Sequence, residues 1–273
     1  MPLSPTFLFV HGAWHGGWCW KLVADDLRAR GYSVFTPTLT GSGERRHLIG
    51  CASLGTYITD VLNVIDNEEL DDIVLVGHSM AGIVVPHVAQ EVPDRVRRLV
   101  LLAAIVLEDG ESELEAMTTE ASATYLEIAA RSGTDSIPLS RQDAVTSLIQ
   151  NASAGLQQWV CRRLTPQPVE PWRGTANLKR FYASAVPTTY IWCDQDLGMG
   201  TPGRPEDWLV HARKLERLRD FSFLVMQSDH EPMISQPDMF ADLLVHLAEV
   251  RQSDDIRGMT RSVSAGIPSS RES

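Results

Sequence analysis

Ser79 occupies a place in the sequence where a serine can act as a nucleophile. The run Ile73 to Gly82 reads I-V-L-V-G-H-S-M-A-G, so an aliphatic stretch typical of a buried strand ends in G-x-S-x-G, and an apolar helical pattern follows. A serine on a tight turn between a strand and a helix exposes its hydroxyl for attack on a carbonyl carbon. Gly77 and Gly82 permit the close approach of strand and helix that this turn requires. We expect Ser79 to be a nucleophile rather than an ordinary surface serine.

A glycine-rich loop near the start of the chain can supply hydrogen-bond donors to the same reaction. His11 to Gly17 reads H-G-A-W-H-G-G and follows the apolar run F-L-F-V. Attack on a carbonyl creates an oxyanion, which backbone N–H groups stabilise where a serine stands on such a turn. The expected donors are the amides of Ala13 and of Met80, the residue after the serine. His11 and His15 are expected to hold the loop by hydrogen bonds, because the general base is expected late in the chain.

Two later segments supply a base and an acid. His230 lies in S-D-H-E-P, after the strand-like run F-S-F-L-V-M, and Asp196 ends C-D-Q-D, after the strand-like run T-Y-I-W. The order Ser79, Asp196, His230 is that of the α/β-hydrolase fold, in which the histidine accepts the serine proton and the carboxylate orients the imidazole. The predicted fold is therefore an α/β-hydrolase fold with a catalytic triad.

Four carboxylates compete for the role of the acid: Asp194, Asp196, Asp229 and Glu231. Asp229 and Glu231 flank His230 directly, and the side chains of neighbours on an extended loop point in different directions. Asp194 directly follows the strand, whereas Asp196 lies further along the loop toward the expected nucleophile. We therefore expect Asp196 to hold the imidazole.

The elements that must position these residues alternate between strands and helices, which predicts a mostly parallel sheet of about six strands with helices on both faces. Strands are expected at residues 6–11, 33–37, 72–77, 97–104, 187–193 and 220–226. Helices are expected at residues 18–30, 54–67, 80–91 and 237–250. The hydrolase core is then expected to comprise residues 1–107 and 183–251.

Residues 108–182 interrupt this alternation and are expected to form a helical lid inserted after the fourth strand. Helix-like patterns cover residues 113–131, 142–151 and 154–163, and the proline-rich segment 165–172 is expected not to be helical. Lid and loop residues could line an apolar substrate pocket, and simple packing inside the lid is the alternative for the lid residues. The candidates are Gly12, Trp14, Met117, Trp159 and Trp172.

The composition limits the class of protein. The 273 residues are 44% hydrophobic, and the net charge of −11 argues against nucleic acid or an anionic membrane as a partner. No stretch suits a membrane span, no basic region suggests a signal peptide, and the four cysteines lack metal-binding spacing, so we expect a cytoplasmic protein without a metal. The polar residues 252–273 are expected to form a disordered tail.

These motifs resemble the α/β-hydrolase subgroup of plant methylesterases and hydroxynitrile lyases, with their bacterial and fungal relatives. The resemblance rests on F-V-H-G-A-W-H-G-G-W, V-G-H-S-M-A-G, C-D-Q-D and S-D-H-E-P-M, and it covers about residues 6 to 250. It implies a compact sheet without extra N-terminal strands, and it implies Asp196 as the acid, because the family's acid aligns with the last residue of C-D-Q-D. Thr38 to His47 also resembles bacterial members, some of which cleave carbamate esters.

Two positions differ from the lyases of this subgroup, which carry a threonine after the first-loop histidine and a lysine after the catalytic histidine. Here these positions are Gly12 and Glu231, and Glu231 has the wrong charge to stabilise a leaving cyanide. The expected function is a serine hydrolase that needs no cofactor and cleaves a small to medium, largely apolar ester, lactone or carbamate. A lyase or cofactor-free base catalyst with the same triad, a non-enzymatic ligand receptor and a homodimeric state stay open.

Overall fold

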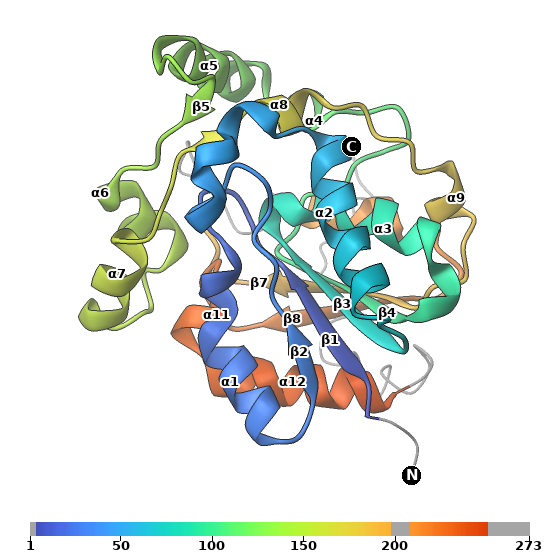
Figure 1. The fold of residues 1–273 in the computed structure, drawn as a ribbon. Coiled ribbons are helices and arrows are strands. Elements are labelled where there is room, and N and C mark those ends of the chain that lie inside the picture. The colour runs from blue at the N-terminus through green and yellow to red at the C-terminus, as the bar shows by residue number, and fades with distance from the viewer. Residues whose placement is uncertain (1–3, 198–207, 251–273) are drawn as a thin grey trace, which may run out of the picture.

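Six strands form a parallel sheet at the centre of the computed structural model, which describes residues 4–197 and 208–250 (Figure 1). The strand order is β2-β1-β3-β4-β7-β8, and every neighbouring pair is parallel. The strands are β1 (Thr6–Val10), β2 (Ser33–Phe35), β3 (Ile73–His78), β4 (Val96–Leu102), β7 (Thr188–Cys193) and β8 (Phe221–Met226). The predicted α/β-hydrolase fold with a six-stranded sheet is confirmed.

Both faces of the sheet are buried, which explains why its strands read as almost continuous apolar runs. In β1, Phe7 and Phe9 pack into the core on one face, while Leu8 and Val10 pack into the core on the other. The first face is covered by α1 (Lys21–Ala29) and α12 (Pro237–Glu249). The second is covered by α2 (Leu54–Asn67), α3 (Val85–Glu91) and α10 (Leu209–Leu215).

Helix α2 shows how local sequence sets these elements. The Ser53 hydroxyl accepts a hydrogen bond from the Thr56 amide at 3.0 Å and so satisfies a free donor at the start of the helix. Buried side chains then recur every three or four residues, at Leu54, Tyr57, Val61 and Ile65. This spacing places them on one side of the helix, against the sheet.

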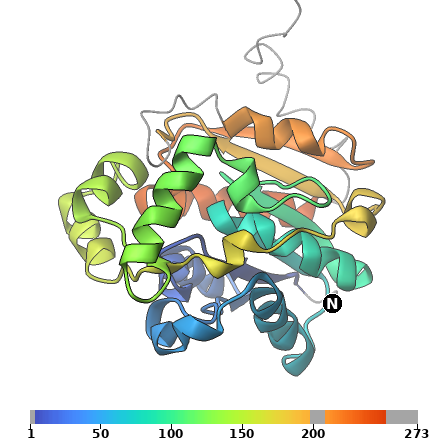
Figure 2. The same ribbon diagram turned by 90° about the horizontal axis from the view of Figure 1, so that it is seen from above.

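The chain between β4 and β7 forms a separate group of short elements. They are α4 (Glu113–Ala116), α5 (Thr119–Arg131), β5 (Ser136–Ile137), α6 (Arg141–Asp143), a π-helical turn (Ala144–Leu148), α7 (Ala154–Cys161), β6 (Gln167–Pro168), α8 (Glu170–Arg173) and α9 (Lys179–Tyr182). Strands β5 and β6 pair with each other in antiparallel fashion. Figures 1 and 2 show α5, α6 and α7 beyond one edge of the sheet and extending to one side of it.

Two expectations for this segment are wrong in detail. The single helix expected over 113–131 is broken, because Thr118 leaves the helical conformation and its hydroxyl caps a new helix through the Ala121 amide at 3.2 Å. The proline-rich segment 165–172 does contain part of a helical turn, Glu170–Arg173. Pro171 is tolerated there because the first turn of a helix does not use its N–H groups. The expected tail, 252–273, lies outside the described residues.

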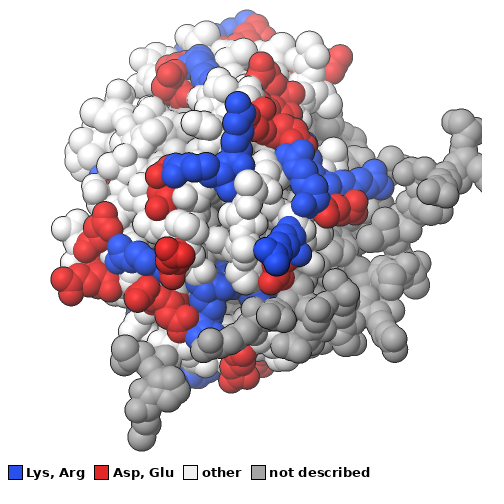
Figure 3. Space-filling view, turned by 90° about the vertical axis from the view of Figure 1, so that its right-hand side faces the viewer, with Lys and Arg blue, Asp and Glu red and all other residues white. Residues whose placement is uncertain are grey.

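Charged side chains on the surface are mixed in sign. Figure 3 shows acidic and basic side chains in small joint groups on one face of the molecule. Exposed pairs include Arg95 with Asp66 at 2.8 Å. Pairs of this kind usually contribute less than about 1 kcal/mol each to stability. Within the described residues, no helix combines the length and hydropathy that a membrane crossing requires.

Candidate active site

The turn after β3 places Ser79 in a strained backbone conformation. Ser79 has a φ of +54°, a left-handed value that costs a non-glycine residue about 1–3 kcal/mol. The glycines on either side are required by close packing, because a Cβ on Gly82 would lie 2.0 Å from the Ile105 carbonyl oxygen and one on Gly77 would lie 2.5 Å from Val85. The Ile105 amide also donates to the Ser79 carbonyl at 3.1 Å. The strand, turn and helix that the sequence predicts around Ser79 are therefore present.

The glycine-rich loop after β1 passes directly beside this turn. A Cβ on Gly12 would lie 2.9 Å from the Cβ of Ser79, so only a glycine lets the loop backbone come so close. The next residue, Ala13, is buried, and Trp14 adopts a left-handed φ of +64°. This places the backbone that carries the expected donor Ala13 next to Ser79.

His11 supports the glycine-rich loop after β1 as an uncharged side chain. Its Nδ1 lies 2.8 Å from the Gly12 carbonyl, and its Nε2 accepts a hydrogen bond from the Leu39 amide at 3.0 Å. Burial lowers the pKa of His11 to about 4, so the imidazole is neutral at physiological pH. His11 therefore supports the loop, as expected from its early position.

The loops after β7 and β8 bring His230 and Asp196 together. Nδ1 of His230 donates to Oδ2 of Asp196 at 2.6 Å, and both side chains are almost fully buried. Burial disfavours the imidazolium, but the negative charge and hydrogen bond of Asp196 outweigh it and raise the pKa of His230 above its usual value. With Nδ1 held by the carboxylate, Nε2 is the ring nitrogen left to exchange a proton.

Two of the three competing carboxylates contact groups other than the imidazole of His230. Asp229 accepts hydrogen bonds from the Asn151 amide at 2.9 Å and from the Ser235 hydroxyl at 2.7 Å, so it braces its own loop. Glu231 lies 3.1 Å from Nε2 of His15. Burial raises the pKa of Asp194, whose side chain follows β7 directly. Asp196, by contrast, contacts the imidazole of His230 at 2.6 Å.

Three further residues that the sequence reasoning missed support these loops. Nε2 of His78 lies 3.0 Å from the His230 carbonyl, and burial holds the pKa of His78 well below its usual value, so this ring is a neutral donor. Two residues of the segment between β4 and β7 contact Gln195, next to Asp196. The Gln150 side chain donates to the Gln195 carbonyl at 2.7 Å, and the Asn151 side chain donates to the Gln195 side-chain oxygen at 2.6 Å. His78 adjoins the serine in the motif and could have been noticed, whereas nothing in the sequence marks Gln150 or Asn151.

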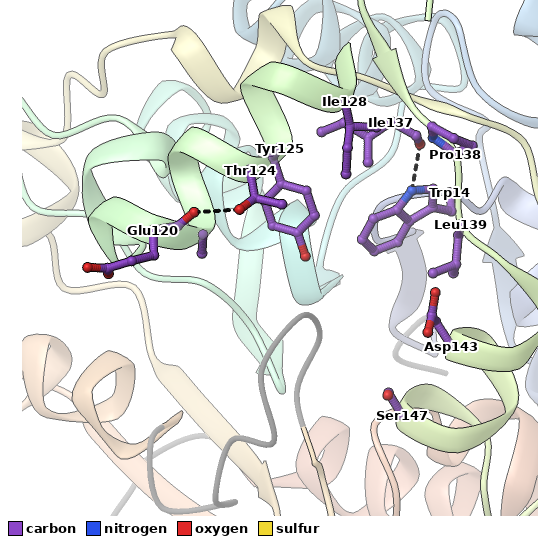
Figure 4. Close-up of a pocket in the computed structure, with 11 residues that line it drawn as sticks. Trp14, Glu120, Thr124, Tyr125, Ile128, Ile137, Pro138, Leu139, Asp143 and Ser147 are labelled. Atoms are coloured by element: carbon purple, nitrogen blue, oxygen red, sulfur yellow. Dashed lines mark hydrogen bonds between the residues drawn. The ribbon is translucent and has the colours of Figure 1, made fainter. Parts of the chain in front are cut away.

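A cavity of about 270 Å³ opens beside Trp14 (Figure 4). Among the described residues, its wall combines apolar and aromatic side chains with two carboxylates and no Lys, Arg or His. The lining residues are Trp14, Glu120, Ala121, Thr124, Tyr125, Ile128, Ile137, Pro138, Leu139, Asp143 and Ser147. The indole Nε1 of Trp14 donates to the Ile137 carbonyl at 2.8 Å, which fixes this side chain in the wall.

The other expected pocket residues occupy different places. Trp172 is buried, and its ring packs edge-on against Trp14 and Tyr125, so it supports two residues of the wall. Trp159 packs edge-on against Trp18, and Met117 packs half-buried against the core on the α2 side. Within the described residues, no three His, Cys, Asp or Glu side chains form a group that could hold a metal ion.

Comparison with known proteins agrees with this architecture. A bacterial protein named carbendazim hydrolyzing esterase, from Nocardioides sp. (strain SG-4G), is 33% identical over 251 residues, which cover 89% of this chain and 99% of that protein. Methylesterase 9 of Arabidopsis thaliana is 24% identical over 258 residues, 89% of this chain and 98% of its own.

Solved structures and a family model give the same result. An extracellular alpha/beta-hydrolase from a Paenibacillus species, described as sharing structural and functional homology with tobacco salicylic acid binding protein 2, superposes with a TM-score of 0.77 at 28% identity, over 89% of this chain and 98% of that one. The model described as "Alpha/beta hydrolase family" matches residues 7–243. This chain therefore belongs to the alpha/beta hydrolase family.

Proposed function

We propose that this chain is a serine esterase in which Ser79, His230 and Asp196 form the catalytic triad. The observation that carries the proposal is the buried 2.6 Å contact between His230 and Asp196, on two loops that end neighbouring strands of the sheet. The strained turn at Ser79 and the close approach of Gly12 to it support the same assignment. Relatives named as esterases support ester cleavage as the reaction.

The reaction would proceed through an acyl-enzyme. Nε2 of His230 takes the proton of Ser79 while the serine oxygen attacks the ester carbonyl, and the amides of Ala13 and Met80 donate to the oxyanion. When the tetrahedral intermediate collapses, the imidazolium gives its proton to the leaving alcohol. Water then attacks the acyl group, with His230 again as the base, and the acid product leaves with Ser79 regenerated.

The segment 108–182 would act as a lid that selects the substrate. The cavity beside Trp14 would hold an apolar or aromatic part of the ester, because its wall is mostly hydrocarbon and aromatic ring. Because Glu120 and Asp143 place negative charge in the wall, the cavity would disfavour an ester that carries a carboxylate. The proposed substrate is therefore a small to medium, largely apolar ester that is neutral or positively charged.

A fluorophosphonate label and a nitrophenyl acetate assay test the proposal together. The protein should take up one label, on Ser79, and should release nitrophenol in a burst followed by steady turnover. Ser79→Ala should lose both the label and the turnover, while Ser122→Ala, at a half-buried position of α5, should keep them. Labelling of the Ser79→Ala protein with activity retained would refute the assignment. Ligand binding without any turnover would instead indicate a receptor, and base catalysis without a burst would indicate a lyase.

A further inference from the structure

His15 and Glu231 form a buried pair between the two loops that carry the proposed oxyanion donor and the proposed base. Oε1 of Glu231 lies 3.1 Å from Nε2 of His15, and the exposed fractions of the two residues are 0% and 1%. Glu231 directly follows His230, and His15 lies two residues after Ala13. The pair therefore connects segments more than 200 residues apart in sequence, immediately beside both parts of the proposed machinery.

The surroundings of His15 favour a charged imidazolium. Its Nδ1 lies 2.7 Å from the carbonyl oxygen of Ala13, and its Nε2 faces the carboxylate of Glu231. The carbonyl and the ionised carboxylate are both acceptor groups and neither can donate, so these neighbours favour a proton on each ring nitrogen. Burial disfavours this charge, but Glu231 outweighs it and raises the pKa of His15 above its usual value.

His11, four residues earlier on the same loop, shows the opposite arrangement. One of its ring nitrogens faces the Gly12 carbonyl, while the other accepts a hydrogen bond from the Leu39 amide. A ring that both donates and accepts is neutral. Burial therefore lowers the pKa of His11, whereas His15 has the Glu231 carboxylate at contact distance and its pKa is raised.

We propose that His15 and Glu231 are positioning residues whose buried ion pair holds the oxyanion loop against the base loop. The inference rests on the proposed function, because it assigns the pair a role in the same reaction. The linkage runs from Glu231 through the imidazolium to the Ala13 carbonyl, and thus to the peptide unit beside the proposed donor. Among the described residues neither Glu231 oxygen has a hydrogen-bond partner, so the 3.1 Å contact is an ion pair that depends on the attraction between the two charges.

The pair also sets the charge around His230. The groups that act on this imidazole are Asp196, Glu231, Asp229, His78 and His15. The first three are carboxylates that stabilise the imidazolium, and His15 opposes it when protonated. Removing the Glu231 charge should therefore lower the pKa of His230, whereas removing the His15 charge leaves Glu231 uncompensated and should raise it.

Three variants of similar size test the role of the His15–Glu231 ion pair, on the full-length protein with nitrophenyl acetate as substrate. Glu231→Gln removes the negative charge, His15→Asn can keep a donor to Ala13 but cannot reach Glu231, and His15→Gln can reach Glu231 but loses the donor to Ala13. A misplacement of about 1 Å can cost up to about a hundredfold in rate, so each variant should lose about tenfold or more in kcat, with KM changed by less than about threefold. The acid limb of kcat/KM should move to lower pH in Glu231→Gln and to higher pH in both His15 variants.

The control is Glu111→Gln, which breaks the partly buried pair of Glu111 and Lys214, 2.7 Å apart and away from the proposed triad. It should keep the kcat and the acid limb of the parent protein. Circular dichroism and thermal melting of each variant separate misplacement from unfolding. Folded variants with parental kcat, or with acid limbs that all move in one direction, would overturn the inference. A parent protein without esterase turnover would refute the proposed function instead.

Discussion

The loops around Ser79 and His230 and the segment between β4 and β7 are held in place by different kinds of interaction. The loops are joined by buried contacts between residues far apart in sequence, such as His78 with the His230 carbonyl and His15 with Glu231. In α5, by contrast, only Ala129 is fully buried, and Arg131 forms an exposed ion pair with Glu127. Several buried contacts therefore fix the loops of the proposed triad, while α5, which contributes to the cavity wall, is held by few buried side chains.

The largest effect should come from breaking the contact of Asp196 with His230. Asp196→Asn should cost about ten thousandfold in kcat, as loss of the orienting carboxylate does in the Ser-His-Asp proteases. Asp194→Asn should cost less than about tenfold, because the imidazole is held by Asp196 instead. The measurement is kcat for the two variants side by side, and a crippled Asp194→Asn beside a near-normal Asp196→Asn would reverse the assignment.

Stability should separate the two regions next. Leu75 of β3 is fully buried, so Leu75→Ala should cost about 2–5 kcal/mol of the free energy of unfolding. Ile128 of α5 is 37% exposed, so Ile128→Ala should change that free energy by no more than about 0.5 kcal/mol. Urea unfolding of both variants measures the difference. Equal losses would show that the segment between β4 and β7 is as firmly packed as the sheet.

The pH dependence of activity should report the environment of His230. The proposed base works only as neutral imidazole, and the negative charge beside it raises its pKa above the usual value of about 6.5 despite burial. Activity should therefore rise with pH and reach half its plateau above about pH 6.5. A kcat/KM profile tests this, and full activity at pH 5 would contradict a histidine base.

The smallest effect should come from the charges in the cavity wall. Asp143→Asn and Glu120→Gln should each raise KM for a positively charged aryl ester by about twofold to fivefold, because both carboxylates are exposed to solvent. The effect should shrink with added salt and should be absent for the neutral ester of the same shape. Glu127→Gln, on the same helix but outside the cavity lining, is the matched control. An equal response of the neutral ester would show that charge does not select the substrate.

The sheet and the turn at Ser79 could be predicted because their signals are local. A strand buried on both faces must be apolar along its length, and a strand, a tight turn and a helix in succession require the glycines at 77 and 82. The break at Thr118 could not be read in the same way, since the apolar pattern continues across it and only the cap at Thr118 shows that a new helix begins.

Contacts between distant residues set the remaining limits of prediction. Strands β5 and β6 have two residues each and exist only because Ser136 and Ile137 meet Pro168 and Gln167 across thirty residues of chain. The support that Asn151 gives to Asp229 likewise depends on where the folded segment lies. In the site, Ser79, Asp196 and His230 could be proposed from their motifs, their order and their positions after strands. The residues that hold their loops could not, because ordinary polar side chains carry no mark of a distant partner.

Trp14 connects the loops around Ser79 with the segment between β4 and β7. This connection has a consequence for how the enzyme diverges from its relatives. Its backbone continues from Ala13, its ring lines the cavity, and its amide and carbonyl are held by the Gln167 side chain and the Thr165 amide. A substitution among residues 165–168 that reshapes the cavity would therefore also shift the loop that carries Ala13, the proposed oxyanion donor. Substrate range and turnover number would then evolve together, so mutations on the two sides of Trp14 should be epistatic rather than independent.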